Sequence, residues 1–437
     1  MKKYTVVILF VFLFNSITAQ QWDIQEKQNM PMKIANNAVT EASVSGNPYV
    51  YSFGGIDSTK LYSGITNKSF KYDVIADSWD TVPDLPDTNT KIAAAASFVN
   101  GKIYIIGGYI VFSNGSEVSS VKIHRFDPIA DTFLTDGVDI PIAIDDHVQA
   151  VYKDSLIFVV TGWSNTSNVA NVQIYDTYLD SWSTGTQVPT TSYQVFGSTG
   201  IIVGDTLYYY GGARSTSNFP ASNQLRKGYI NPIDPTQITW QTSILSRFIT
   251  VYRPACTKID GTVLWVGGSE TSYNFDGIAY NGSGGVPISN RIISYNTRKD
   301  TFYTHMPSMD SIPMDLRGIA SISDSVKYIV EGMSGKQKVS NKTFKLEYKL
   351  TTSLKENQNV VSIVVAPNPF GERLELSFKE YKRGRIEIFN ASGQLIVQIE
   401  KKNQARIAIN TSSWEKGIYY LRYSFQDSQG MQKVLKL

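Results

Sequence analysis

Short apolar runs that end in glycine recur along most of this 437-residue chain, at intervals of roughly 50 to 65 residues. Such runs are typical of strands that are covered on both faces, and glycine permits the unusual backbone torsion that follows. The repeat therefore predicts one kind of β unit, built several times over. The six runs end at Gly55, Gly108, Gly162, Gly212, Gly268 and Gly332.

Two aromatic residues follow most of these runs, seven positions apart. The residues between them include Asp and Pro, which favour turns, so each pair predicts a hairpin of two strands. In the fourth copy Tyr229 and Trp240 are eleven apart, which indicates an insertion in the turn through Pro232 and Pro235. The pairs with constant spacing are Tyr72 and Trp79, Phe126 and Phe133, Tyr175 and Trp182, and Tyr295 and Phe302.

The doubled glycine, the aromatic residue before Asp, the second aromatic residue and a following proline resemble the kelch repeat over about residues 20–350. The resemblance implies an all-β protein with a six-bladed kelch-type β-propeller, in which each blade is a four-stranded antiparallel sheet. Thr161 and Glu331 each replace one glycine of the doublet, but their copies keep the strand pattern. A β-sandwich or two smaller barrels, the alternative, would not require one pattern to recur.

The sixth copy lacks an aromatic fourth strand, and the matching piece stands near the other end of the chain. Trp22 followed by Met30-Pro31 repeats the pattern of Phe302 followed by Met306-Pro307. We therefore predict that residues 20–31 supply the outer strand of the last blade and close the ring.

The first 19 residues have the layout of a secretory signal peptide. Lys2 and Lys3 precede an apolar run from Val6 to Phe14, and Ala19 is a small residue before the predicted cleavage point. A membrane anchor would need about 20 apolar residues, so no transmembrane segment is expected in the mature chain. Cys256 is the sole cysteine, which excludes an intramolecular disulfide.

A second β pattern occupies residues 366–437, after a polar stretch at 351–365 that we interpret as a linker. It resembles the type A C-terminal sorting domain of the type IX secretion system of Bacteroidota, which implies recognition by that translocon and a secreted or cell-surface protein. The expected fold is a small Ig-like β-sandwich, and an Ig-like binding or spacer module is the alternative. The resemblance rests on Pro367, Asn368, Pro369, Gly393, Gly417, Tyr419 and Lys433.

Composition limits the function classes. The formal charge is +3 and shows no polyelectrolyte character, so nucleic acid is not an expected partner. Motifs for zinc, phosphate loops and calcium loops are absent from the sequence, and no cofactor or metal is expected. A copper radical oxidase, known among secreted kelch proteins, needs a linked Cys and Tyr with two His ligands. Cys256 and three well-separated histidines support that chemistry poorly.

The loops between the second and third strands and those leading to the next blade should lie on one face, where a ligand would bind. Arg214, Tyr273 and Phe275 stand in such loops, and aromatic rings beside Asn and Ser suit sugar recognition but also loop packing. Cationic side chains at equivalent positions before the glycine runs could hold a carboxylate or sulfate, or serve the fold. These are Lys91, His147, Arg253 and Arg317.

Two functions follow as hypotheses. The first is the binding of a glycan or protein ligand through the loop face. The alternative is a carbohydrate-active enzyme of the sialic-acid mutarotase type, known among six-bladed bacterial relatives, which needs an acid or base and an anion anchor. The candidate acid or base is Glu331, Glu270, Asp145 or Asp146, with Arg253 or Arg317 as the anchor, and no motif selects one of them.

Overall fold

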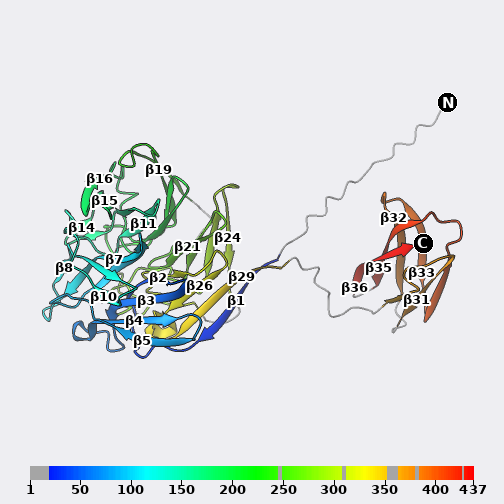
Figure 1. Cartoon of the computed structure of the whole chain (residues 1–437), viewed down its shortest axis with the longest axis horizontal. Helices are drawn as coiled ribbons and strands as arrows, with labels where there is room; N and C mark the ends of the chain where they lie inside the picture. The colour runs from blue at the N-terminus through cyan, green and yellow to red at the C-terminus, as the bar shows by residue number, and fades with distance from the viewer. Residues whose placement is uncertain (1–18, 245–248, 308–311, 352–362, 379–382, 426–427) are drawn as a thin grey trace. The chain divides into compact units, whose positions relative to one another are not determined.

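The computed structural model describes residues 19–244, 249–307, 312–351, 363–378, 383–425 and 428–437 (Figure 1). One compact unit spans Gln20–Lys349, and the described residues from Leu350 to Leu437 belong to another. Residues 1–18 of the predicted signal peptide, and residues 352–362 of the predicted linker, lie outside the described residues. Across the described part of the chain, no helix has the length and apolar character required to cross a membrane.

The first unit consists of six principal sheets, and four strands in each follow one another from the axis outward. The first sheet is β2 (Ala38–Val44), β3 (Asn47–Ile56), β4 (Ile65–Asp73) and β5 (Ser78–Val82). The second is β6 (Ile92–Val99), β7 (Lys102–Val111), β9 (Ile123–Asp127) and β10 (Thr132–Phe133), with β8 (Glu117–Ser119) on β7. The third is β11 (Val148–Tyr152), β12 (Leu156–Val160), β15 (Val172–Asp176) and β16 (Ser181–Thr184).

The other three sheets repeat this order. The fourth is β17 (Thr199–Val203), β18 (Thr206–Tyr210), β19 (Gln224–Ile230) and β20 (Ile238–Ile244). The fifth is β21 (Ala255–Ile259), β22 (Thr262–Val266), β23 (Ile292–Asn296) and β24 (Thr301–His305). The sixth is β25 (Ala320–Ser321), β26 (Val326–Val330), β29 (Thr343–Thr351) and β1 (Ala19–Lys27).

Short elements complete the connections between these strands. Two strand pairs and two 3-10 helices lie in loops after second strands. They are β13 (Trp163–Ser164) with β14 (Ser167–Asn168), β27 (Met333–Ser334) with β28 (Lys338–Val339), η1 (Tyr62–Gly64) and η2 (Gly335–Gln337).

Five neighbouring pairs of first strands contact each other: β2 with β6, β6 with β11, β11 with β17, β17 with β21, and β25 with β2. The fifth and sixth blades are joined just before their first strands, where the amide of Leu316 donates to the carbonyl of Arg253 at 3.1 Å. The unit is therefore a closed six-bladed β-propeller, as the repeat predicted. Each glycine-ended run forms the second strand of its blade, and its apolar side chains are buried because neighbouring blades cover both faces.

The last blade combines the two ends of this unit. β1, dark blue in Figure 1, lies beside β29, in yellow, as the outer strand of the sheet. The rings of Trp22 and Tyr348 are 5.2 Å apart, and the amide of Met30 donates to the carbonyl of Asn341 at 2.9 Å. The ring is thus closed by two segments more than 300 residues apart in sequence.

The predicted hairpins join the third and fourth strands. In four blades the two aromatic residues lie directly opposite each other, as in the pair of Tyr72 and Trp79. In the fourth blade Trp240 lies opposite Gly228, and Tyr229 lies opposite Thr239. The expected pair is thus displaced by one residue, and the indole covers Gly228, where a Cβ would come within 2.7 Å of the Trp240 ring.

The glycine doublets allow the second strand to approach the next blade. Gly211 has φ +75°, and a Cβ there would lie 2.3 Å from the carbonyl oxygen of Val251. Gly204, in a turn of the same blade, has φ +60° but nothing within 4 Å of a Cβ. Left-handed backbone costs an alanine about 1–2 kcal/mol at both positions, whereas the collision with Val251 applies to Gly211 alone.

We therefore expect Gly211→Ala to lower the free energy of unfolding by about 1–3 kcal/mol more than Gly204→Ala, the overpacking cost in a filled interior. Urea unfolding of both variants checks this. Equal losses would show that the backbone torsion, and not the contact between blades, requires the glycine.

The second unit is a β-sandwich. One sheet has the order β30 (Ile363–Ala366), β31 (Arg373–Phe378) and β34 (Arg406–Asn410). The other has the order β33 (Leu395–Lys401), β32 (Gly384–Asn390), β35 (Gly417–Phe425) and β36 (Ser428–Lys436). Leu374, Ile386 and Leu421 are among the buried core. β30 begins at Ile363, within the stretch interpreted as a linker, and Ile363 and Val365 belong to this core.

The residues that carried the sorting-domain resemblance lie at turns and along the last strands. Asn368, between Pro367 and Pro369, accepts a hydrogen bond from the Leu435 amide at 2.9 Å. Gly393 occupies the β32–β33 turn with φ +80°, and Gly417 begins β35. The remaining two lie on β35 and β36: Tyr419 donates to the carbonyl of Glu415 at 2.8 Å, and Lys433 pairs with Tyr420.

Candidate functional site

A cavity of about 160 Å³ opens among the loops on one face of the propeller. Its walls come from loops after second strands and from loops that enter the next inner strand, as expected for the ligand face. Apart from aromatic residues, its lining consists of polar and charged side chains. The lining residues are Tyr109, Glu117, Asp145, Asp146, Trp163, Phe196, Phe219, Arg253, Asn274 and Tyr280.

Aromatic rings from three blades form one wall of this loop-face cavity. Trp163 packs edge-on against Phe196 at 5.4 Å and against Phe219 at 5.6 Å between ring centroids. Tyr280 lies 5.0 Å from Phe219. The edge-to-face contacts hold the rings in place with little freedom, which gives a preformed apolar surface for a ligand.

The acidic residues of the cavity differ in environment. Asp145 is 3% exposed, and Ser119 donates to its Oδ2 at 2.6 Å. Burial, with the neighbouring Asp146 charge, raises the pKa of Asp145 well above its ordinary value. Glu117 lies at the exposed end of β8, and partial loss of water also raises its pKa.

A buried ion-pair cluster forms the floor. The Arg253 guanidinium donates to both carboxylate oxygens of Asp146, at 3.2 and 2.5 Å, and to Asp315 at 2.9 Å. All three side chains are at most 2% exposed. Burial raises the pKa of Asp315 to about 6, while the two carboxylates hold the pKa of Arg253 above its ordinary value.

The three residues of this cluster belong to a set of six with left-handed backbone, one in each blade. Close to the start of each inner strand there is a residue with positive φ, and Asp146, Arg253 and Asp315 are three of these six residues. The amide of Gly197 donates to Asp146, and that of Arg253 donates to Gly197, so successive blades are joined at this level. Such torsions are costly for residues other than glycine, and they fix the floor of the cavity. The other members are Asn36, Ala93 and Gly197.

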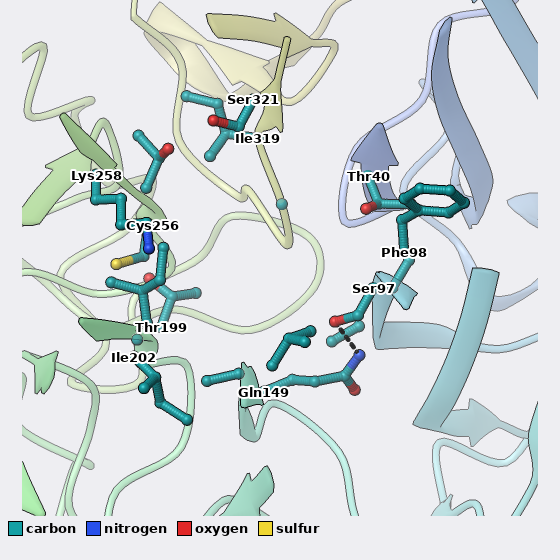
Figure 2. A pocket seen from close by; sticks show the side chains of 18 of the residues that line it. Thr40, Ser97, Phe98, Gln149, Thr199, Ile202, Cys256, Lys258, Ile319 and Ser321 are labelled. Carbon is teal, nitrogen blue, oxygen red and sulfur yellow. Dashed lines mark hydrogen bonds between the residues drawn. The ribbon is translucent and has the colours of Figure 1, made fainter. Parts of the chain in front are cut away.

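A second cavity, of about 500 Å³, is the central channel between the inner strands. Figure 2 shows part of its mixed lining, which includes Thr40, Phe98 and Lys258, and the hydrogen bond from Gln149 to Ser97. Arg317 and His147 line the channel, whereas Arg253 and Asp146 line the loop-face cavity. The contact of Arg317 with Asp146, at 3.4 Å, therefore lies between the two cavities.

The four predicted cations have partners inside the protein. Lys91 pairs with Asp87 at 3.0 Å, and Arg317 donates to the carbonyl of His147 at 2.9 Å. His147 shares a hydrogen bond with Gln149, and burial lowers the pKa of His147 to about 4, which makes it neutral at pH 7. Of the four, Arg253 alone lines the loop-face cavity. Anion binding by these residues stays a prediction.

The other candidates are dispersed. Glu331 is fully buried between the last and first blades, where Ser52 donates to its Oε1 at 3.5 Å, and burial raises its pKa. In the described part of the chain no ion pair joins Glu331 to Arg253 or Arg317. Arg214 is exposed in its loop, and Phe275 is partly buried in loop packing. Tyr273 is fully buried, 5.1 Å from the Tyr252 ring.

Several lining residues were not among our candidates, notably Glu117, Trp163, Phe196 and Tyr280. A positional signal exists for two of them. Trp163 directly follows the Thr161-Gly162 doublet, and Phe196 directly precedes the left-handed residue of its blade. Glu117 and Tyr280 stand between the second and third strands of their blades, where the connections differ in length. The repeat therefore does not align their positions with those of other blades.

Comparison with known families agrees with this geometry. Residues 93–134 match the model of the Kelch motif, and residues 364–436 match that of the secretion system C-terminal sorting domain. The chain carries a kelch motif and a C-terminal sorting domain. Both predicted resemblances are thereby confirmed. The sorting domain belongs to type IX secretion, which implies export to the cell surface or the medium.

The individual relatives share little sequence identity with this chain. Kelch-like protein terF of Aspergillus terreus is 26% identical over 162 residues, which are 36% of this chain and 34% of that protein. Beta-scruin of Limulus polyphemus is 23% identical over 319 residues, 71% of this chain and 32% of that protein. The matched regions thus span about a third of the length of these curated relatives.

A solved structure described as "Structure of YjhT" superposes with a TM-score of 0.56 and 13% sequence identity. The match covers 72% of this chain and 95% of the other. At this identity the likeness shows the fold alone.

Proposed function

We propose that this exported kelch propeller binds glycans, and that one sugar ring occupies the loop-face cavity. The main support is the composition of the lining, where Trp163, Phe219 and Tyr280 stand beside Asn274 and carboxyl groups. A pyranose ring packs its C–H face on an aromatic ring, and amide and carboxyl oxygens bond its hydroxyls. The cavity volume of about 160 Å³ matches a single ring better than a protein segment.

The aromatic wall supplies the first test. Trp163→Ala should weaken glycan binding about tenfold, which corresponds to the loss of about 1.4 kcal/mol of packing on one face. Tyr178→Ala removes an exposed aromatic ring from a hairpin turn and should leave binding unchanged. A glycan array with the full mature chain, followed by calorimetry on each hit, checks both. Absence of any glycan hit would overturn the proposal and direct the search to protein ligands.

A mutarotase-type enzyme is the second candidate, favoured by one observation. Neighbouring carboxyl groups on the cavity have different environments, because burial raises the pKa of Asp145 while Asp146 is paired with Arg253. Such pairs suit proton transfer to and from a sugar ring. Asp145 replaces Glu331 as the candidate acid, since Glu331 does not line the cavity.

Anomeric exchange measured by NMR separates the two functions. An enzyme should accelerate the exchange of the bound sugar, and Asp145→Asn should abolish the acceleration while Trp163→Ala weakens binding. Binding with the uncatalysed exchange rate would establish a binding protein without this activity.

The sorting domain makes a prediction about location. Removal of residues 363–437 deletes all strands from β30 to β36 and leaves the propeller unit, Gln20–Lys349, complete. In a host with type IX secretion, the truncated protein should remain in the periplasm, while the full chain reaches the surface or the medium. Immunoblots of both fractions check this, with the melting temperature of the purified propeller as the folding control. Normal release of the truncated protein would contradict the role of the domain.

A further inference from the structure

The loop-face cavity has an acidic wall without an available cation. Glu117, Asp145 and Asp146 line it, and Arg253 is the single Lys or Arg in the lining. The Arg253 guanidinium is already engaged by Asp146 and Asp315 through three hydrogen bonds. A ligand carboxylate would compete with both partners of Arg253 and would lie beside other acids, so an anionic sugar is disfavoured.

Asp145 retains unused hydrogen-bonding capacity. Ser119 occupies its Oδ2, whereas the described residues supply no hydrogen bond to its Oδ1. The groups that act on this carboxyl are Glu117 on β8, the adjacent Asp146, and Arg253 from the loop before β21. None of them stabilises an ionised Asp145 strongly enough to offset burial, which leaves the side chain ready to receive a positive partner.

The aromatic residues favour the same class of ligand. Five aromatic side chains line the cavity together with the carboxyl groups: Tyr109, Trp163, Phe196, Phe219 and Tyr280. An ammonium group over the face of such a ring gains about 0.5–2 kcal/mol of interaction free energy, and the gain is larger where water is excluded. A cavity that combines rings with carboxyl groups therefore has the chemistry of a site for an organic cation.

We propose that the ligand of the loop-face cavity is an amino sugar whose protonated amine binds Asp145 and Glu117. The inference rests on the proposed glycan-binding function and narrows its ligand class. The aromatic rings hold the sugar face, and the ammonium group donates to the free Oδ1 of Asp145 at the acidic wall. Pairing with the ammonium group favours the ionised form of Asp145 and so opposes the rise in pKa that burial causes.

The experiment compares three probes with the full mature chain by calorimetry: a glucosamine oligosaccharide, its N-acetylated counterpart and N-acetylneuraminic acid. The glucosamine oligosaccharide should bind at least tenfold more tightly than the other two. Its binding heat should depend on the ionisation enthalpy of the buffer over the pH range in which Asp145 changes charge, because pairing with the ammonium group lowers the pKa of Asp145 and so releases protons. Since release favours the complex at lower proton concentration, the affinity should rise with pH while the amine stays protonated.

Variants locate the effect. Asp145→Asn should remove the proton release and reduce glucosamine affinity to that of the N-acetylated sugar, without changing the latter. Glu117→Gln, at an exposed position, should weaken glucosamine binding several-fold. This variant tests the proposal if Asp145→Asn does not fold. Asp260→Asn, at an exposed ion pair with Arg298, is the matched control and should change nothing.

The outcomes separate the two proposals. Equal or tighter binding of the N-acetylated or the sialic sugar overturns the amino-sugar inference and leaves glycan binding standing. Failure of all three sugars to bind overturns the amino-sugar inference, and absence of any hit on the glycan array overturns both proposals. Tight glucosamine binding that persists unchanged in Asp145→Asn and Glu117→Gln also overturns the inference, because the amine then binds elsewhere.

Discussion

Arg253→Met is expected to lower the free energy of unfolding by about 3–5 kcal/mol, the usual cost of removing one member of a buried ion pair. Asp146 and Asp315 would lose the guanidinium, whose nitrogens donate to their carboxylate oxygens at 2.5 to 3.2 Å. Both carboxylates are almost completely buried. The melting temperature should fall by about 5–10 °C in a propeller of this size. Differential scanning calorimetry of the full chain measures the change.

Two further variants serve as controls for Arg253→Met. Arg298→Met removes an arginine whose ion pair with Asp260 is exposed, and it should cost less than about 1 kcal/mol. Arg253→Lys keeps the charge but cannot donate to two carboxylates in fork geometry. The free energy of unfolding of this variant should therefore be closer to that of Arg253→Met than to that of the native protein. A native-like Arg253→Met variant would show that Asp146 and Asp315 are neutral without the arginine, and that the cluster does not hold the blades together.

Removal of residues 20–31 is expected to destabilise the propeller by at least about 3–5 kcal/mol. Met30 is 1% exposed, and burial of one such side chain contributes about 1.5–3 kcal/mol. The contact of Trp22 with Tyr348 and the hydrogen bonds of Met30 and Asn341 are lost as well. The exposed edge of β29 should also promote association, so the truncated protein should elute earlier from a sizing column as its concentration rises.

A synthetic peptide of residues 20–31 provides the control. Added to the truncated protein, it should restore the melting temperature and abolish the concentration dependence, because it can reoccupy the edge of β29. An unchanged melting temperature without the peptide would show that the outer strand does not hold the last blade closed.

Prediction from the sequence worked where the determinants are local. The apolar runs before Gly108 and Gly212 could be identified as buried strands, because strand burial on both faces requires continuous apolar residues. The constant spacing of Tyr72 and Trp79 placed them opposite each other, since a tight turn fixes the register. The same reasoning missed the register at Trp240, because an inserted turn allowed a one-residue shift onto Gly228.

The candidate site was predicted much less well. Arg253 was recognised as a cation near the axis, but its partners Asp146 and Asp315 are 107 and 62 residues away in sequence. Glu331 was selected as an acid or base, yet its side chain extends into the contact between the last and first blades. The direction in which a side chain points from a left-handed residue depends on the neighbouring blade, which one repeat unit does not encode.

The sequence by itself determined the repeated blade, the number of blades and the type of the C-terminal domain, because each depends on patterns within about 60 residues. Tertiary structure alone decided which residues line the loop-face cavity and how acidic it is. Glu117, Asp145, Trp163 and Tyr280 come from loops of the second, third and fifth blades and meet when the ring closes. Their proximity, and the burial that raises the pKa of Asp145, are properties of the closed ring and of no single segment.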